Sequence, residues 1–523
     1  MTILKAWNEQ WPKIKVSQPA ATGEGVLDIG AFKSIEVDSV FNTINYAQTT
    51  IGQAVLYRSL ARPLDNLQAI ADKQKALKEI QVNPELKATL ARLVENAKKD
   101  EKSFHQLLFA KFLGSGGTAR NDAEIEGYGY TQYRRGTRFI LAFVAGLLRL
   151  EKPKSAYLDA LINDVRAFTQ TRAYSLMSGP AYITEKGIQS KIDRKNLSPA
   201  IIFKPHIFKP LLIGLVLATL IGVNLFVPIG LLSFSPMFAI FLAPLALVYF
   251  PLIGGFDRDS CIKPLREEYR QSDDVAKVLE VLGSVDELLS LVQYAESNPG
   301  AMVLPELIVA KHHKINLKNA KNPVLSKVDA TYVGNDFSID TEKLVLITGP
   351  NSGGKTAFCK TLTQIQLLAQ IGSYVPAAQA TLTVADRIFY QVPEISQLDD
   401  GEGRFGTELK RTKDIFLAST AKSLVVLDEL SEGTTFEEKM ETSANVLNGF
   451  YQKGNNTILI THNHQLVDHF LAEHKGVALQ VQFVGEDPTH KLILGISRVS
   501  HAHRVAKKIG FSKEDIAGYL ADN

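Results

Sequence analysis

Residues 349–356 read Gly349-Pro350-Asn351-Ser352-Gly353-Gly354-Lys355-Thr356. The apolar run 344–347 comes just before this stretch, and a long helical pattern, 357–371, comes directly after it. A strand, a glycine-rich loop and a helix in this order bring backbone N–H groups and the positive end of a helix dipole together, which suits a phosphate chain. In such a loop Lys355 reaches the β- and γ-phosphates and Thr356 binds Mg²⁺. The alternative is a glycine-rich turn that matches the pattern by chance. The flanking strand and helix favour a nucleotide site, and we predict that ATP binds here.

Two further apolar runs end in residues that ATP hydrolysis uses. The run 424–427 leads into Asp428 and Glu429, and such a strand end places one acid at Mg²⁺ and the other beside the attacking water. The run 457–460 leads to His462, which can contact the γ-phosphate there, although taken alone it would be an ordinary loop histidine. We therefore predict an α/β P-loop ATPase domain. Its predicted catalytic residues are Lys355, Glu429 and His462, its metal ligands are Thr356 and Asp428, and its other nucleotide contacts include residues 349–354, Ala357 and Tyr332.

Length and composition indicate a protein of several domains. The chain has 523 residues, of which 45% are hydrophobic, so we expect about two to four domains with buried cores. The net charge of +3 is too small to favour or exclude nucleic acid. The two cysteines, Cys261 and Cys359, are too few for a disulfide framework or a zinc site, which suits a reducing compartment. Residues 1–15 contain no apolar signal-peptide core, so we expect the N-terminal domain to be cytoplasmic.

The N-terminal part of the chain has helical periodicity. We expect one helix that ends before Pro63, because proline lacks an N–H, and two more over 66–80 and 84–99. Within 128–138, three tyrosines and three arginines form a cluster that could stack bases and neutralise phosphates. We favour the alternative, a solvated helix face that leads into a core helix over 139–150.

The stretch from Pro210 to Phe256 contains no charged residue. Its length allows for two membrane spans of about 20 residues each, and basic residues on both flanks place both flanks in the cytoplasm. The sequence thus predicts a two-helix transmembrane hairpin in the cell membrane. The alternative is a buried hairpin in a soluble core or a dimer interface. The predicted domains are an α-helical core and lever domain over 1–205, the hairpin over 206–256, a returning lever helix over 257–300 and the P-loop ATPase domain over 301–523.

Several motifs resemble those of the MutS mismatch-repair ATPases. The phosphate loop is followed by the stretches 370–376 and 386–389, which are specific to that family among P-loop proteins. The acidic strand end with its loop, 428–435, the pair 461–462 and the closing segment 500–506 are similar to the family as well. The resemblance implies a MutS-like fold and a homodimer with two composite ATP sites that use Mg²⁺. It also implies binding of mismatched or branched DNA.

The resemblance covers residues 37–80 and 322–523, and the helical middle is only loosely similar. Because the core-like segment begins so early, we expect no mismatch-recognition domain, and the predicted hairpin stands where the family has a DNA clamp. Where the family's signature stretch carries a serine, this chain has Gly403. We hypothesise that Arg404 contacts the γ-phosphate bound by the other subunit. The alternative is that Arg404 is solvated and pairs with a neighbouring glutamate.

These features together predict a membrane-anchored MutS-like ATPase that couples ATP hydrolysis in a dimer to DNA binding at the membrane. The anchor would be residues 210–256. The alternative is a membrane mechanochemical ATPase that moves its hairpin without binding DNA. An ABC-type half-transporter is disfavoured, because one hairpin cannot line a substrate pathway and the sequence has no Leu-Ser-Gly-Gly-Gln signature.

Overall fold

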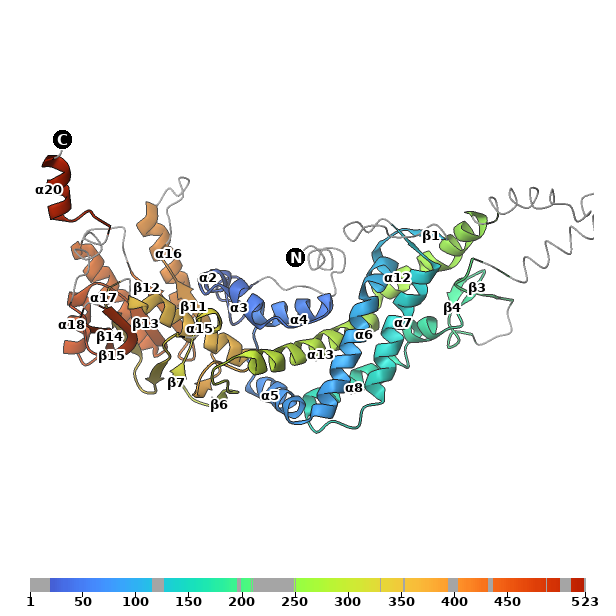
Figure 1. Cartoon of the computed structure of the whole chain (residues 1–523), viewed down its shortest axis with the longest axis horizontal. Coiled ribbons are helices and arrows are strands. Elements are labelled where there is room, and N and C mark those ends of the chain that lie inside the picture. The colour runs from blue at the N-terminus through green and yellow to red at the C-terminus, as the bar shows by residue number, and fades with distance from the viewer. Residues whose placement is uncertain are drawn as a thin grey trace, which may run out of the picture. The chain divides into compact units, whose positions relative to one another are not determined.

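The structure is a computed structural model of the chain, drawn in Figure 1. It divides into two compact units. The helical unit includes Ala47–Val55 and Glu79–Leu289, and the sheet unit includes Val16–Tyr46, Leu56–Lys78 and Ser290–Asn523. The structure describes residues 19–114, 127–194, 199–207, 209, 249, 251–329, 331–350, 353–393, 403–430, 436–485, 487–498 and 509–521.

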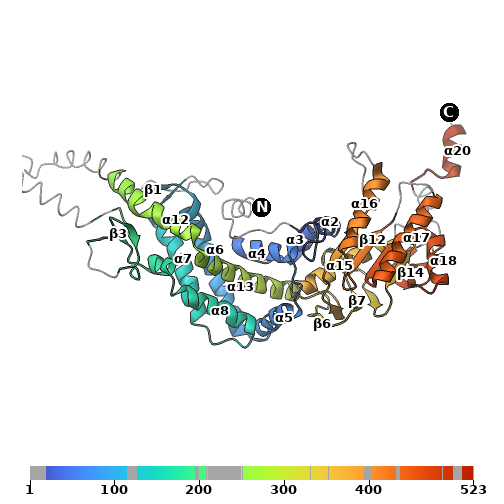
Figure 2. The same ribbon diagram turned by 180° about the vertical axis from the view of Figure 1, so that it is seen from behind.

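The helical unit is built on two long helices, α6 (Pro84–Phe109) and α7 (Tyr130–Leu148). They lie side by side, as Figures 1 and 2 show from opposite sides. Helix α6 continues beyond its predicted end at residue 99, because Phe104 and Leu107 prolong its buried face. The other elements of this unit are α8 (Ala156–Phe168), α9 (Arg172–Ser178), the π-helical turn η1 (Arg258–Ile262), α12 (Lys263–Gln271) and the short strands β1 (Phe112–Gly114), β2 (Tyr128–Gly129), β3 (Tyr182–Thr184), β4 (Gly187–Gln189) and β5 (Ile201–Ile202).

Three helices contribute residues to both units. The proline-terminated helix predicted before residue 63 is α4, and the helix predicted over 66–80 is α5. The helix over 66–80 and the end before Pro63 are confirmed to within about two residues. The segment that the sequence predicted to open at Asp38 is wrong at its start, because the chain forms two helices there, α3 (Val37–Ile44) and α4. The bounds of these helices are Thr50–Ala61 for α4, Leu67–Val82 for α5 and Asp273–Ser297 for α13.

The tyrosines of the 128–138 cluster belong to the core of the helical unit. Tyr128 is fully buried, and Tyr130 and Tyr133 are 6% and 5% exposed. The ring of Tyr133 packs edge-on against Phe203, with centroids 5.7 Å apart. The hydroxyl of Tyr130 donates a hydrogen bond to Asp257 at 2.7 Å. These rings are therefore not available to stack bases, and the expected solvated face is formed by the arginines of the cluster, which are more exposed.

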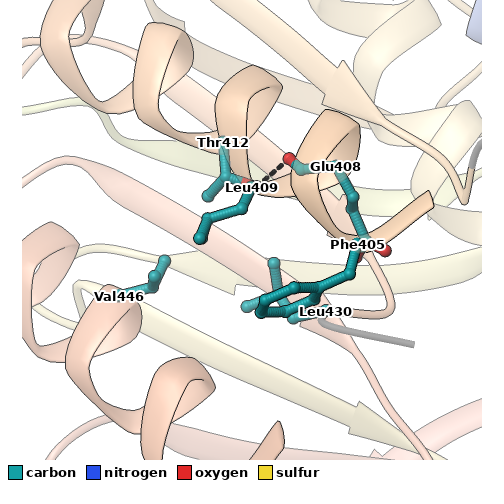
Figure 3. Close-up of a pocket in the computed structure, with 6 residues that line it drawn as sticks. All are labelled: Phe405, Glu408, Leu409, Thr412, Leu430 and Val446. Carbon is teal, nitrogen blue, oxygen red and sulfur yellow. Dashed lines mark hydrogen bonds between the residues drawn. The ribbon is translucent and has the colours of Figure 1, made fainter. Parts of the chain in front are cut away.

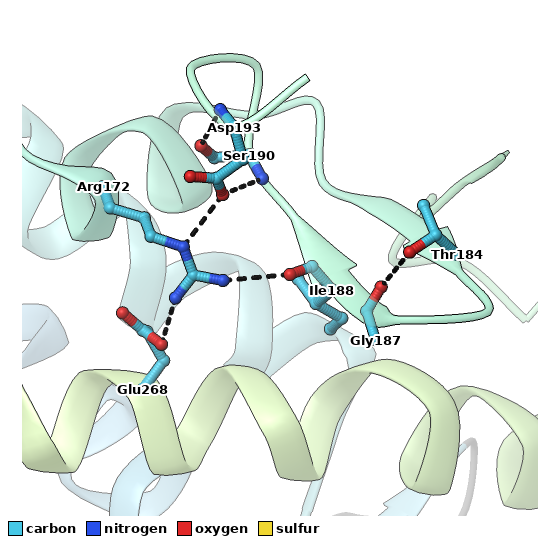
Figure 4. Close-up of polar contacts among 7 residues, drawn as sticks. All are labelled: Arg172, Thr184, Gly187, Ile188, Ser190, Asp193 and Glu268. Atoms are coloured by element: carbon cyan, nitrogen blue, oxygen red, sulfur yellow. Dashed lines mark hydrogen bonds and ion pairs between the residues drawn. The ribbon is translucent and has the colours of Figure 1, made fainter. Parts of the chain in front are cut away.

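Arg172 fixes the three-stranded sheet β4-β3-β5 to the helices of the same unit (Figure 4). Its guanidinium donates to Asp193 Oδ2 at 2.8 Å and to the carbonyl oxygen of Ile188 at 2.9 Å, and it also contacts Glu268 of α12. Asp193 accepts a further bond from Ser190 N at 2.8 Å. Because one arginine satisfies a carbonyl and two carboxylates at once, we read this cluster as structural.

A buried carboxylate from α13 closes the N-terminus of α4. Asp286 is 1% exposed and accepts hydrogen bonds from Gln48 N at 3.0 Å, from Thr49 N at 2.7 Å and from the Thr49 hydroxyl at 2.7 Å. Thr49 Oγ1 in turn accepts from Gly52 N at 2.9 Å, as an N-cap side chain does. Position 52 has no room for a side chain, since a Cβ there would lie 2.2 Å from Asp286 Oδ2.

Glu101 of α6 completes this closure. Its carboxylate accepts from Thr50 N and Ile51 N, each at 2.9 Å. Burial raises the pKa of Glu101 to about 6; the two backbone hydrogen bonds lower it in part, and the charge of Asp286 adds to the rise. The first N–H groups of α4, which a helix cannot satisfy by itself, are thus satisfied by two acids of the same chain.

The predicted transmembrane hairpin is contradicted. Among the described residues, no helix is both long enough and apolar enough to span a bilayer, so the two spans over 206–256 and the cell-membrane localisation that depended on them are corrected. Residues 210–248 and 250 lie outside the described residues. Hydropathy reports that side chains avoid water and does not distinguish lipid from a protein interior. At the described ends of the stretch, Lys209 Nζ lies 2.8 Å from the buried carboxylate of Asp257.

The sheet unit contains a six-stranded sheet of order β11-β12-β13-β9-β14-β15. Its neighbouring strands are parallel except for the antiparallel hairpin of β14 and β15. A second sheet has the order β6-β10-β7-β8. The strands are β6 (Glu306–Ile308), β7 (Ile315–Ala320), β8 (Asn335–Ile339), β9 (Leu344–Thr348), β10 (Gln379–Thr383), β11 (Ile388–Gln391), β12 (Leu424–Asp428), β13 (Asn456–Ile460), β14 (Val477–Val484) and β15 (Asp487–Leu494).

Helices cover both faces of the six-stranded sheet. Leu344 and Leu346 of β9 share one core cluster with side chains from α16, α17 and α18. Val345 and Ile347 point to the other face, and α15 packs against β12 and β13. This arrangement is the α/β domain predicted from the sequence, and its strands β9, β12 and β13 are buried along most of their length, as central parallel strands are. The helices of this unit are α2 (Ile29–Ser34), α3 (Val37–Ile44), α14 (Leu325–Val328), α15 (Lys355–Gln370), α16 (Gly403–Ala418), α17 (Phe436–Lys453), α18 (His464–Ala472) and α20 (Lys513–Ala521).

Candidate nucleotide site

The phosphate loop joins the end of β9 to the start of α15, as predicted. Gly349 and Gly354 have φ angles of +132° and +91°, a backbone region that favours glycine. Within the loop, Gly353 N donates to the carbonyl oxygen of Pro350 at 3.0 Å. The predicted contacts Asn351 and Ser352 lie outside the described residues.

Lys355 begins α15 with its side chain inside the loop. It is 2% exposed, and its ammonium donates to the carbonyl oxygen of Gly349 at 2.5 Å. Burial lowers the pKa of Lys355, while the negative charges of Glu429 and Asp428 oppose that change. The lysine is therefore held at the loop by the Gly349 carbonyl, with two acids near enough to act on its charge.

Thr356 and Asp428 meet at the carboxyl end of the sheet. The Thr356 hydroxyl donates to Asp428 Oδ2 at 3.0 Å. One residue comes from the first turn of α15 and the other from the last position of β12. A hydroxyl and a carboxylate are hard oxygen ligands of the kind that Mg²⁺ takes, so this pair fits the predicted metal site.

Glu429 and His462 also lie together. Glu429 follows β12 with a φ of +66°, an uncommon backbone state for a residue other than glycine, and its N–H donates to the carbonyl of Ile460 at 2.9 Å. Its Oε1 is 3.6 Å from His462 Nε2, and its Oε2 is 3.8 Å from Lys439 Nζ. His462 thus lies at the acidic strand end, and its predicted contact with the γ-phosphate stays a prediction. Lys439 of α17 was missed, because a lysine near the start of a helix carries no local signal for this contact.

Tyr332 and Ala357 lie near the same helix. The Tyr332 hydroxyl is 3.3 Å from Thr361 Oγ1 of α15, and burial raises the pKa of the Tyr332 phenol. Ala357 is in the first turn of α15 and is partly exposed. For Arg404, the structure describes only the backbone, which lies at the start of α16.

The start of α16 packs onto the residue that follows Glu429. Figure 3 shows side chains of α16 around a shallow pocket that also includes Leu430. Glu408 is 2% exposed, and its backbone carbonyl accepts from the Thr412 hydroxyl at 2.9 Å and from Gln391 Nε2 at 3.2 Å. The pocket is lined by Phe405, Glu408, Leu409, Thr412, Leu430 and Val446.

Helix α15 carries buried polar side chains that the sequence analysis did not single out. Gln370 Nε2 donates to the carbonyl of Leu64 at 2.8 Å, and Gln364 Nε2 donates to that of Ile35 at 2.7 Å. Gln366 Oε1 lies 3.1 Å from His313 Nε2, and burial lowers the pKa of His313 to about 4, so this imidazole is neutral. Long-range partners of this kind leave no mark in local periodicity. Cys359 on this helix is fully buried.

The sheet unit matches a known protein family. The family model described as MutS domain V matches residues 345–518. "DNA mismatch repair protein MutS" of Desulforamulus reducens is 37% identical over 199 residues, which is 37% of this chain and 22% of the relative. "DNA mismatch repair protein MutS" of Thermotoga maritima is 31% identical over 258 residues, 47% of this chain and 31% of the relative. "DNA mismatch repair protein MSH3" of Kluyveromyces lactis is 31% identical over 247 residues, 45% of this chain and 24% of the relative.

The aligned part therefore spans between 22% and 31% of the length of these relatives. Residues 345–518 are thus similar to MutS domain V, and the chain resembles these MutS relatives over less than half of its own length.

Proposed function

We infer that the chain is a MutS-family ATPase that binds ATP with Mg²⁺ at the phosphate loop and hydrolyses it. The observation that carries this proposal is the approach of Thr356 Oγ1 to Asp428 Oδ2, at 3.0 Å, beside the buried ammonium of Lys355. A cation, a hydroxyl and a carboxylate at the end of a glycine-rich loop form the polar set that phosphoryl transfer uses.

Each side chain has a separate role in this proposal. Lys355 exchanges its contact with the Gly349 carbonyl for the β- and γ-phosphates, which its charge stabilises. Thr356 and Asp428 would hold Mg²⁺, which would supply positive charge to neutralise the phosphates. Glu429 orients and polarises the attacking water, and His462, 3.6 Å from its carboxylate, contacts the γ-phosphate.

Two variants of the full chain test this assignment. Glu429→Gln should keep MgATP affinity within about twofold and lower kcat by about 10²–10⁴-fold, because an amide is a poor proton acceptor. Lys355→Ala should instead weaken MgATP binding by about 10- to 100-fold, since a charge-assisted contact is lost. Glu473→Gln, at an exposed acid paired with Lys475, is the matched control and should change neither quantity. Equal loss of affinity in the Glu429 and Lys355 variants would contradict the division of roles.

We further propose that the chain works as a homodimer and binds DNA, mismatched or branched. Support comes from the names of the relatives, which are DNA mismatch repair proteins. In this proposal the Arg404 side chain of one subunit contacts the γ-phosphate bound by its partner. The comparisons favour this function over a membrane mechanochemical ATPase.

A titration at several salt concentrations tests DNA binding. Matched, mismatched and branched duplexes are compared with and without ATP, and affinity should fall steeply as salt rises, because phosphate contacts release counterions. Mass measurement in solution with and without MgATP tests the dimer. A chain that hydrolyses ATP but shows no salt-dependent affinity for any duplex would remove DNA from the proposal and leave the ATPase assignment standing.

A further inference from the structure

The hairpin of β14 and β15 lies directly against the phosphate loop. His490 of β15 places Nδ1 3.3 Å from the carbonyl oxygen of Gly353. A Cβ added at Gly354 would lie 3.4 Å from the same nitrogen, and one added at Gly353 would lie 2.9 Å from Val481 of β14. The two glycines before α15 are therefore in contact with this hairpin.

The position of His490 is fixed by its surroundings. Asn335 of β8 is 6% exposed, and its amide donates to the His490 carbonyl at 3.0 Å and accepts from Leu492 N at 2.9 Å. His490 itself has a φ of +59°, which residues other than glycine seldom adopt. Lys491 beside it contacts the carbonyl of Gly334. A buried amide thus bridges β8 to β15 around this one histidine and holds it in an uncommon backbone state.

The contact matters because a phosphate loop binds anions through its N–H groups. For those groups to face the phosphates, the loop carbonyls must face away, and each carbonyl then needs a donor of its own on that side. The peptide unit between Gly353 and Gly354 carries both functions: its carbonyl receives the His490 Nδ1–H, and its N–H, that of Gly354, points the opposite way because the trans peptide is planar.

We propose that His490 is a positioning residue of the phosphate loop: by donating to the Gly353 carbonyl from outside, it holds the loop in the form that accepts a di- or triphosphate. This inference rests on the proposed function, because its effect is measured through nucleotide binding. His490 acts on the phosphate chain and not on the base, so its loss weakens ATP and inorganic triphosphate by the same factor.

Three variants of the full chain test the role. His490→Leu removes the donor at similar size and should raise the Kd for MgATP and for magnesium triphosphate by about three- to tenfold, the effect of one hydrogen bond. His490→Asn places an amide nitrogen where Nδ1 lies and suits a positive φ, so its Kd should return to within about twofold of the native value. His474→Leu is the matched control: His474 is also exposed, with a φ of +53°, and follows α18.

Kd values come from equilibrium titration, and thermal unfolding is recorded for every variant. Native affinity in His490→Leu, or an equal loss in His490→Asn, overturns the proposal. So does a loss in His474→Leu as large as that in His490→Leu. If the native chain binds neither MgATP nor magnesium triphosphate, the proposed function itself is refuted. If the native chain binds both ligands and His490→Leu binds them equally well, only the role of His490 is refuted.

Discussion

The N-termini of α4 and α15 both have backbone N–H groups that find no acceptor within their own helix. The chain provides for these groups in two different ways. At α4, Asp286 and Glu101 accept the first backbone N–H groups, and the end is closed by internal acids. At α15, a loop with two positive-φ glycines leads into the helix, and the nearby acid Asp428 accepts from the Thr356 hydroxyl. A helix end attracts anions in either case. The two N-termini differ in the source of the anion. At α4 it is a carboxylate of the chain itself, so this closed end is structural, whereas the open end at α15 is arranged for a bound ligand.

Removing a carboxylate from the closed end gives the largest effect that we expect. Asp286→Ala leaves two backbone N–H groups and a hydroxyl without their acceptor and should lower the free energy of unfolding by about 3 kcal/mol. Urea unfolding measures this change, with the exposed Asp274→Ala on the same helix as the control, expected within about 0.5 kcal/mol. MgATP affinity of the folded variant should stay native. A tenfold loss of MgATP affinity in Asp286→Ala would contradict the assignment of a purely structural role to the N-terminus of α4.

The closed end should also make stability depend on pH. Burial raises the folded-state pKa of Glu101 to about 6 from its ordinary value of 4.5, so between these values the folded chain binds more protons than the unfolded chain. The free energy of unfolding therefore falls as pH rises through this window, by about 2 kcal/mol, and levels off above it. Burial raises the pKa of Asp286 as well, in the same direction.

Unfolding curves of the native chain and of Glu101→Gln at pH 4 to 8 isolate this contribution as their difference. The native chain should lose its stability relative to the variant as pH rises. If the native chain instead gains stability relative to Glu101→Gln as pH rises, Glu101 is stabilised as a carboxylate. The N-terminus of α4 would then resemble a strong anion site.

Gly52→Ala should give the smallest effect of the three. Alanine in a helix interior is ordinarily better than glycine by about 1 kcal/mol, but here its Cβ meets Asp286 Oδ2 at 2.2 Å. We expect the free energy of unfolding to fall by about 1–2 kcal/mol. Gly518→Ala, in α20 with nothing within 4 Å of the added carbon, is the control and should stabilise its helix. A gain in both variants would show that Asp286 moves aside at little cost.

The strands and the phosphate loop of the sheet unit could be predicted from the sequence. Continuous apolar runs such as 344–347 and 424–427 form central parallel strands, which are buried on both faces and so leave an uninterrupted pattern. The residues that follow those runs converge because parallel strands end at one edge of the sheet. This is why the sequence could predict that Lys355, Asp428 and Glu429 lie close together.

Partners distant in sequence could not be predicted. The tyrosines at 128, 130 and 133 were expected on a solvated face and are buried, since helical period alone does not say what packs on a face. Gln366 and His313 meet inside the core, and Asp286 meets Thr49, across separations that no local pattern records. The stretch 210–256 was assigned to lipid on its lack of charge, its length and its basic flanks, and the described residues contain no helix able to span a membrane.

Cys359 and Cys261, the two thiols of the chain, are both fully buried. Burial raises the pKa of each thiol, so the reactive thiolate is disfavoured at both positions. Cys359 lies one turn past Lys355 on α15, and a maleimide reaches it only when that helix opens. The rate of Cys359 alkylation therefore reports how often α15 opens locally. A bound nucleotide should lower that rate. A cysteine introduced at the surface should therefore react with maleimide much faster than the two buried native thiols.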